Sequence, residues 1–298
     1  MNRVMIHEWE ERMPMAELGE KGAGLIELDS LGLPVPEALI IPPTFQKAYH
    51  RRDAASRRAM IARLVESIVD FRAALDAPLP LLSFRCGYKS RRGQPKIFPD
   101  SVLNLGLDAA ITGHALAAGV EETYPDDLRS VCADHADAFY RFLGAAMPAG
   151  FPSLPLPRQI ELLLIPFLEA FRNRETAEPA TIIVQRMVYG TLSDDSLTGM
   201  CYTRHPHTGE RMDYGHFILH RQGMALGGVS SDAQLDMGVM AMYNEPAYRQ
   251  LKAACALIEE HYRDIRCLEY TAERDRLFIL QNTVGNRTFI IGSGRASE

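Results

Sequence analysis

The sequence predicts a protein of mixed α and β structure, with helices concentrated in its first part and strands in its second. Residues 53–76 and most of 108–174 have the patterns of helices. From Thr181 onward, short runs of β-branched and other apolar residues are separated by turn-rich pieces, which is typical of strands. Helices followed by strands indicate the α+β class, with a mixed α/β arrangement as the alternative.

Local patterns predict the elements of the first part in order. Residues 16–32 begin with glycine and lysine and continue with apolar residues at helical spacing, so we expect a loop that leads into a helix. The proline-rich segment 33–43 should be extended, because a proline disfavours helical backbone in the residue before it. A short strand is expected over 79–87, followed by a polar loop from Ser90 to Pro99.

The second part is predicted to hold strands around one helix. Strands are expected over 181–190, 197–204 and 216–222. Residues 246–263 form an amphipathic pattern whose first residue is a proline, which suits the first turn of a helix. Residues 266–282 alternate around a polar turn, so we expect a β-hairpin.

Composition and charge restrict the classes of function. The chain has 298 residues, of which 47% are hydrophobic, enough for one large domain or two smaller ones. A net charge of −6 argues against general nucleic-acid binding, and no apolar run is long enough to span a bilayer. The N-terminus lacks the pattern of a signal peptide, and five widely spaced cysteines disfavour a disulfide scaffold or zinc site. We therefore expect a cytoplasmic protein with no nucleic acid or membrane as partner.

Four segments carry a more specific signal. They are LGEKGAGLIELDSLGLPVPEALII from Leu18, LLSFRCGYK with PDSVLNLGL from Leu81, VQRMVYGTLSDDSLTGMCYTRHPHTGE from Val184, and HYRDIRCLEYTAERDRLFILQNTVGNRT from His261. Together they resemble the nucleotide-binding domain of the pyruvate phosphate dikinase and phosphoenolpyruvate synthase family, in the family's order and over nearly the whole chain. The resemblance implies an ATP-grasp fold with two subdomains and the nucleotide cleft between them.

The resemblance also suggests a division of the chain. Residues 1–178 would form the helix-rich subdomain with phosphate-contacting loops. Residues 179–298 would form the sheet-rich subdomain with the adenine and metal positions.

Three basic residues match phosphate-contacting positions of the family. Lys21 lies in a GEKG turn, where glycines let the backbone approach a phosphate and the ammonium offsets its charge. Arg85 ends a strand and presents a planar fork suited to phosphate. Lys89 keeps the charge of a second basic position without the fork. From the residues alone, a solvated turn lysine is the favoured interpretation of Lys21, and an edge arginine that reaches water is the alternative for Arg85. The resemblance makes Lys21 and Arg85 the candidate catalytic residues.

The strand VQRMVYG resembles the segment that holds adenine in the family. Adenine needs apolar contacts on its faces and hydrogen-bonding groups at its edge. Gln185, Met187 and Val188 are the candidates. An ordinary half-buried strand is the alternative.

The C-terminal hairpin provides the metal candidates. Glu269 and Gln281 match the family's metal- and nucleotide-contacting carboxylate and glutamine, and Mg²⁺ prefers such oxygen ligands. If residues 274–276 form a three-residue turn, these two side chains lie opposite each other on one face. A salt-bridged surface strand is the alternative. The resemblance thus implies ATP and Mg²⁺ as cofactors.

Several positions depart from the family pattern. Cys267 replaces an acidic residue, Thr283 an arginine, Met224 a glutamate and His205 an acidic residue. A thiol carries little charge at neutral pH, and threonine cannot neutralise charge on a transferring phosphoryl group as arginine does. These changes weaken the expectation of catalysis more than that of the fold.

The loop after Lys89 also differs from the family's glycine- and methionine-rich segment. It is longer and more basic, with Arg91, Arg92 and Lys96. Two interpretations stay open: a loop that folds over a polyphosphate, or a solvated loop without that role.

Two hypotheses of function follow. In the first, the chain transfers phosphate from Mg-ATP to a histidine on a separate phosphohistidine-domain protein, or to a small molecule. The resemblance uses up the length of the chain, so we expect neither the phosphohistidine domain nor the pyruvate domain within it. In the second, the chain is a degenerate dikinase-like protein that binds nucleotide, or nothing, and acts as a regulatory or scaffold protein.

Overall fold

The computed structural model describes residues 4–6, 18–77, 79–87, 101–117, 124–170, 181–221 and 234–285. Contacts between α-carbons divide the chain into two compact units. The first comprises Met1–Ile26 and Pro36–Met187, and the second comprises Glu27–Val35 and Val188–Glu298. Both units contain helices and strands, which is compatible with the predicted α+β class.

The described residues of the first unit contain a five-stranded sheet in the order β1-β2-β5-β3-β4. Its strands are β1 (Val4–Ile6), β2 (Ala38–Ile41), β3 (Leu82–Gly87), β4 (Ser101–Leu105) and β5 (Thr181–Arg186). β1 runs parallel to β2, and the other pairs are antiparallel. β5 lies at the centre of the sheet because it pairs with both β2 and β3.

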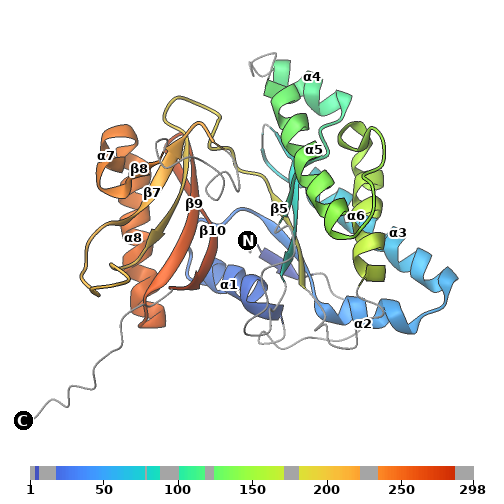
Figure 1. Cartoon of the computed structure of the whole chain (residues 1–298), viewed down its shortest axis with the longest axis horizontal. Helices are drawn as coiled ribbons and strands as arrows, with labels where there is room; N and C mark the ends of the chain where they lie inside the picture. Colours follow the sequence, from blue (N-terminus) through green and yellow to red (C-terminus); the bar gives the residue numbers. More distant parts are fainter. Residues whose placement is uncertain are drawn as a thin grey trace, which may run out of the picture. The chain divides into compact units, whose positions relative to one another are not determined.

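Helices cover one face of this sheet (Figure 1). They are α2 (Pro43–Arg51), α3 (Ala54–Ala73), α5 (Tyr124–Phe142) and α6 (Leu156–Ala170). The core between helices and sheet centres on Phe84, whose ring meets Phe139 and Phe167 edge-on at centroid distances of 6.3 and 6.2 Å. Edge-to-face rings at such distances pack favourably. The Asp53 side chain caps α3 by accepting from the Ser56 amide, which explains where this predicted helix begins.

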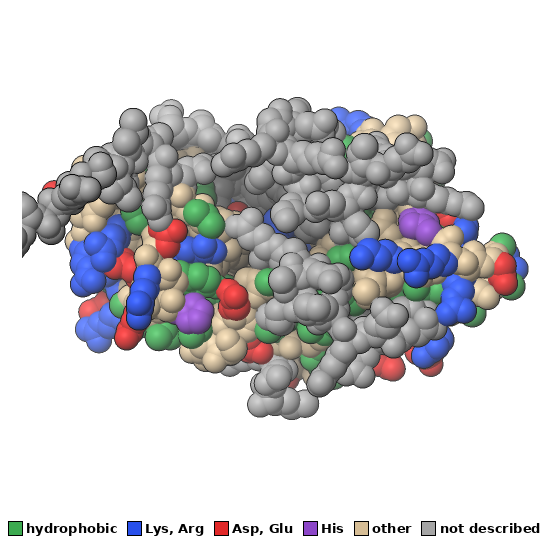
Figure 2. Space-filling view, turned by 90° about the horizontal axis from the view of Figure 1, so that it is seen from below, with side chains coloured by type: hydrophobic (Ala, Val, Ile, Leu, Met, Phe, Trp, Pro, Cys, Tyr) green, Lys and Arg blue, Asp and Glu red, His purple; other side chains and the backbone are tan. Residues whose placement is uncertain are grey.

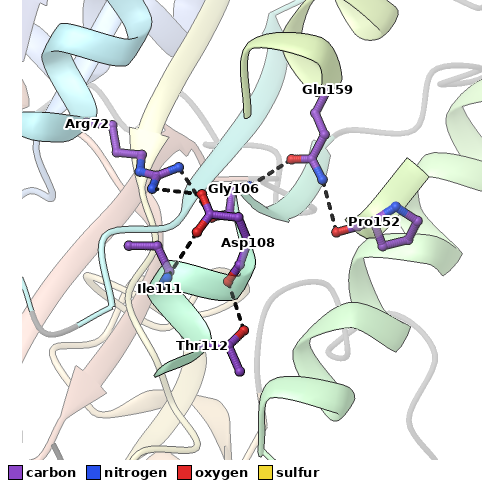
Figure 3. A network of polar contacts seen from close by, with 7 residues as sticks. All are labelled: Arg72, Gly106, Asp108, Ile111, Thr112, Pro152 and Gln159. Atoms are coloured by element: carbon purple, nitrogen blue, oxygen red, sulfur yellow. Dashed lines mark hydrogen bonds and ion pairs between the residues drawn. The ribbon is translucent and has the colours of Figure 1, made fainter. Parts of the chain in front are cut away.

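A polar network holds the end of β4 against these helices (Figure 3). The Arg72 guanidinium reaches the Gly106 carbonyl oxygen at 3.3 Å and the Asp108 carboxylate at 3.4 Å, and Gln159 accepts from the Gly106 amide at 2.8 Å. Gly106 has φ +91°, and a β-carbon there would lie 2.6 Å from Arg72 Nη1. The position therefore requires glycine. Asp108 also accepts from the Ile111 amide at the start of α4 (Ala109–Ala117).

Helix α1 (Gly19–Ser30) begins at the glycine of the GEKG motif, which the sequence placed in a loop. Gly22 explains the difference. A β-carbon on Gly22 would lie 3.2 Å from Thr181 Cγ2 of β5, so the glycine lets the first turn of α1 approach β5 closely. The Thr181 hydroxyl also donates to the Leu18 carbonyl oxygen.

The described residues of the second unit contain a five-stranded antiparallel sheet in the order β10-β9-β6-β7-β8. Its strands are β6 (Leu197–Tyr202), β7 (Tyr214–Leu219), β8 (Leu235–Asp236), β9 (Arg266–Glu273) and β10 (Arg276–Val284). Helices α7 (Met240–Tyr243) and α8 (Glu245–Tyr262) pack on one face, where Tyr270 meets Met240 and Cys201 meets Cys255. Glu269 of β9 is adjacent to Tyr270, so Glu269 and its partner Gln281 of β10 project from the other face.

The two units divide the strands differently from the sequence-based division at 178/179. β5 belongs to the first unit, although the expected boundary placed it in the second. Residues Glu27–Val35 belong to the second unit, where the Pro34 carbonyl oxygen accepts from the Ile279 amide. Such pairings join residues far apart in sequence, and local patterns do not report them.

Charged side chains of both signs are interspersed on the face in Figure 2. Elsewhere in the chain, charged side chains form ion pairs within helices, such as Arg141–Asp137, Arg158–Glu161 and Arg249–Glu245. Among the described residues, no helix combines the length and apolar character needed to cross a bilayer.

Candidate functional site

In the first unit, Arg85 is held by Gln185. The Arg85 guanidinium donates from Nη1 to the Gln185 side-chain oxygen at 3.0 Å across strands β3 and β5. The Gln185 side chain also donates to the Pro36 carbonyl oxygen at 3.4 Å, and Gln185 is only 2% exposed. Gln185 was singled out for the adenine edge, and its buried amide is placed to position Arg85.

Lys21 lies in the first turn of α1 and is partly exposed. The turn packs against Thr181 of β5. Alternate residues of a strand project to one face, so Thr181, Ile183 and Gln185 share this face of the sheet. Ile183 pairs directly with Arg85, so Arg85 belongs to the same face. The structure therefore brings two predicted basic residues to one face of one sheet.

Met187 and Val188 follow β5 at the boundary of the two units, and both are buried. The Met187 amide donates to the Leu81 carbonyl oxygen at 2.9 Å. One residue further on, the Tyr189 amide donates to Glu273 at 2.8 Å. The segment is thus fixed at both ends by hydrogen bonds.

Some predicted positions lie outside the described residues. These are Lys89, the basic loop with Arg91, Arg92 and Lys96, and Met224.

In the second unit, the hairpin brings Glu269 and Gln281 together as direct cross-strand partners. We expected this pairing from a three-residue turn at residues 274–276, but the turn has two residues. Glu273 pairs with Arg276, so the loop holds Arg274 and Asp275 only, with Arg274 in the left-handed region at φ +53°. A register shift between Ile279 and Gln281 restores the alignment.

Paired residues in an antiparallel sheet project to the same face, so Glu269 and Gln281 form one oxygen-rich pair. In the described part of the chain, no group of three or more His, Cys, Asp or Glu side chains could hold a metal ion. One carboxylate and one amide oxygen nevertheless suit Mg²⁺ in a nucleotide complex, where phosphate and water supply the other oxygens.

The two departures from the family pattern are also direct partners. Cys267 pairs with Thr283 two residues along the hairpin from Glu269 and Gln281, and the Thr283 and Tyr202 hydroxyls hydrogen-bond the Cys267 sulfur. Burial raises the pKa of Cys267 to about 11, so the thiol is neutral at pH 7. An acidic residue and an arginine at these positions would form a cross-strand ion pair. This chain has a neutral hydrogen-bonded cluster in its place.

The sheet face continues the Glu269 row onto two further strands. Glu269 pairs with Met200 on β6, and Met200 pairs with His216 on β7. Sequence reasoning missed Met200, Tyr202, Tyr214 and His216. The alternation of side chains along a strand could have indicated Met200 and Tyr202. They flank the fully buried Cys201, so both project to the opposite face of β6.

The loop after β6 is fastened to α8. Arg204 donates from Nε to Glu259 at 2.7 Å, and Lys252 forms an ion pair with Asp213. Arg204 therefore anchors this loop. His205 accepts the His207 and Thr208 amides at its Nδ1, 3.2 and 3.1 Å away, and acts as a local cap.

Known proteins similar to this chain include several pyruvate, phosphate dikinases. A pyruvate, phosphate dikinase of Flaveria trinervia is 28% identical over 91% of this chain, and one of Arabidopsis thaliana is 28% identical over the same share. Pyruvate, phosphate dikinase 2 of Zea mays is 27% identical over 91% of the chain. This chain is similar to the pyruvate, phosphate dikinases.

The resemblance inferred from the four segments is thereby confirmed. The chain spans about a third of the length of these relatives, 33–36%. No model of a known protein family matches the chain.

Proposed function

We propose that the chain binds Mg-ATP as a dikinase-like module with an ATP-grasp fold and transfers phosphate from it. The Glu269–Gln281 pair carries this proposal, because the hairpin brings the carboxylate and the amide together on one face. The confirmed similarity to pyruvate, phosphate dikinases supports it. The acceptor is a histidine on a separate protein or a small molecule.

Each candidate residue then has a role that its surroundings suit. Lys21 and Arg85 contact phosphates, and Gln185 holds Arg85 in place. Met187 and Val188 contact adenine with buried apolar side chains. Mg²⁺, when bound to Glu269 and Gln281, neutralises phosphate charge.

The cation that Thr283 does not supply is proposed to come from the basic loop. The candidates from the sequence are Lys89 and three basic residues that come after it, Arg91, Arg92 and Lys96. Replacing Arg91, Arg92 and Lys96 by alanine together should abolish transfer but leave most ATP affinity, because the contact forms as charge develops. Equal losses of turnover and affinity would contradict this role.

Five free thiols suit a reducing compartment, so we propose the cytoplasm as the place of action.

Titration calorimetry tests whether Glu269 and Gln281, which we call the metal pair, hold Mg²⁺ with ATP. The parent should bind ATP only with Mg²⁺, and Glu269→Gln should weaken binding by about tenfold or more, since hydrogen bonds and contacts to charged groups contribute roughly 1.5–3 kcal/mol. Glu260→Gln is the matched control, because Glu260 is an exposed carboxylate on α8. No heat from the parent with millimolar Mg-ATP would overturn the proposal. Binding without transfer to any acceptor would favour the degenerate protein.

A further inference from the structure

A small hollow opens beside the Glu269 row on the same face of the second unit's sheet. Its volume is about 290 Å³, and its lining residues include Met200, Tyr202, Pro206, His207, Tyr214 and His216. All of them belong to β6, β7 or the loop that joins these strands. We call this hollow the β6–β7 pocket.

Aromatic rings dominate the walls of the β6–β7 pocket. The Tyr202 and Tyr214 rings lie 5.7 Å apart at 65°, and the His207 ring stands 6.4 Å from Tyr214 at 84°. The His205 ring also lies 4.4 Å from the Tyr214 ring, and these edge-to-face rings together form an aromatic wall that a further ring can contact. The volume is at the small end of ligand pockets, which suits a molecule with a single ring.

The loop that supplies Pro206 and His207 is held in place from both ends. Arg204 before it binds Glu259, and Asp213 after it accepts from Tyr248 at 2.5 Å. These partners are on α8, on the opposite side of the sheet from the metal pair. A wall fastened in this way needs little ordering when a ligand binds.

His216 lies in the same cross-strand row as Glu269 of the metal pair. The register places Glu269, Met200 and His216 in one row, so two strand spacings, about 10 Å, separate the backbones of Glu269 and His216. The cross-strand partner of His216 on β8 is Asp236, whose side chain accepts from the Gly238 amide at 2.7 Å. Burial lowers the pKa of His216, so its imidazole is neutral at pH 7 and can accept a proton.

We propose that the β6–β7 pocket binds the phosphate acceptor, a small planar aromatic molecule with a ring hydroxyl, and that His216 is its general base. The proposal rests on the proposed Mg-ATP site. The acceptor oxygen forms a bond to the γ-phosphorus while the bond from that phosphorus to the β,γ-bridging oxygen breaks and ADP leaves. The hydroxyl proton passes to the His216 imidazole. A histidine acceptor is already a neutral nucleophile and needs no base, whereas a hydroxyl acceptor does.

Binding of phenol tests the pocket without ATP. Saturation-transfer NMR should show phenol bound to the parent and cyclohexanol, which is not planar, unbound. Tyr214→Leu should weaken phenol binding at least tenfold, and His207→Ala should weaken it less. His220→Asn is the matched control, because His220 is an exposed histidine with φ +51°, a conformation that asparagine tolerates. Equal phenol binding by the parent and both pocket variants, with unchanged thermal melting, would overturn the pocket.

Turnover tests the base. With phenol, catechol or a hydroxypyridine, the parent should release ADP, and His216→Gln should lower the rate about 100-fold or more at unchanged ATP affinity. ADP release that is equal in the parent and His216→Gln would overturn the role of His216. If the parent binds Mg-ATP but none of the three acceptors stimulates ADP release, the acceptor proposal fails and the Mg-ATP site stands. If the parent binds phenol but not Mg-ATP, the proposed function and the acceptor role fail and the pocket stands.

Discussion

The first and second sheets carry their candidate residues in different electrostatic settings. On the first sheet, Arg85 keeps the family's charge, and the buried Gln185 supports it at 3.0 Å. On the second sheet, the Cys267–Thr283 pair is neutral where the family has an acid and an arginine. Both departures fall on one cross-strand pair, so an acid and an arginine at these positions would be direct partners. Under the proposed function, the first sheet keeps a cation for phosphate, and the second sheet lacks the charged pair that the resemblance implies beside the transferring group.

The largest expected effect comes from restoring the charges one at a time. Cys267→Asp would place a second carboxylate beside Glu269 without a partner, and we expect it to lower the free energy of unfolding by about 2–3 kcal/mol. Adding Thr283→Arg should recover much of this loss, with a coupling energy of about 1–3 kcal/mol. Urea unfolding of the parent, both single variants and the double variant measures the cycle. Additive effects would show that the two positions are not coupled.

The next effect concerns the charge retained on the first sheet. Lys21→Ala and Arg85→Ala should each weaken ATP binding by about 1.5–3 kcal/mol, because each removes a charge-assisted phosphate contact. Arg58→Ala is the control, because Arg58 is an exposed arginine on α3. If both variants bind ATP like the parent in calorimetry, the phosphate site lies elsewhere.

A smaller effect should follow when the support of Arg85 is removed. Gln185→Leu replaces the buried amide with an apolar side chain of similar size and removes the side-chain oxygen that accepts from Arg85, so ATP affinity should fall by about 1 kcal/mol. Ser83→Ala on the same face of β3 is the control, because the Ser83 hydroxyl donates to the Gln185 backbone oxygen at 3.3 Å and not to the side-chain oxygen that accepts from Arg85. The Gln185→Leu change should add little in an Arg85→Ala background. Full additivity would show that Gln185 acts independently of Arg85.

The smallest effect is a pH dependence of stability in the second unit. The folded pKa of His216 lies below its ordinary value of 6.5, so the unfolded chain binds the proton more readily. Stability should therefore be retained above pH 6.5 and fall as the pH drops below it. The groups near His216 are Tyr214 and His207 in the pocket and Asp236 on β8. His216→Gln should melt with less change between pH 7.5 and 5.5 than the parent or His220→Asn, and an identical change in all three would contradict it.

Local patterns were sufficient for the elements that stand by themselves. The helix expected over 53–76 is α3, and the helix expected over 246–263 is α8, because caps and apolar spacing are written in adjacent residues. The hairpin was also predictable, although its turn has two residues and a register shift completes the Glu269–Gln281 pairing. Strands β1 and β4 were not expected, since a short strand depends on its partners for stability.

The sequence alone determined the long helices α3 and α8, the resemblance to the dikinases and the positions of Glu269 and Gln281 in one hairpin. Only the tertiary structure decided that β5 lies in the first sheet, that Gln185 supports Arg85, and that Cys267 and Thr283 are partners. It also placed His216 in the Glu269 row through Met200. Sheet neighbours are set by the joint burial of apolar faces and by hydrogen bonds between distant segments, whereas local patterns report only what adjacent residues favour.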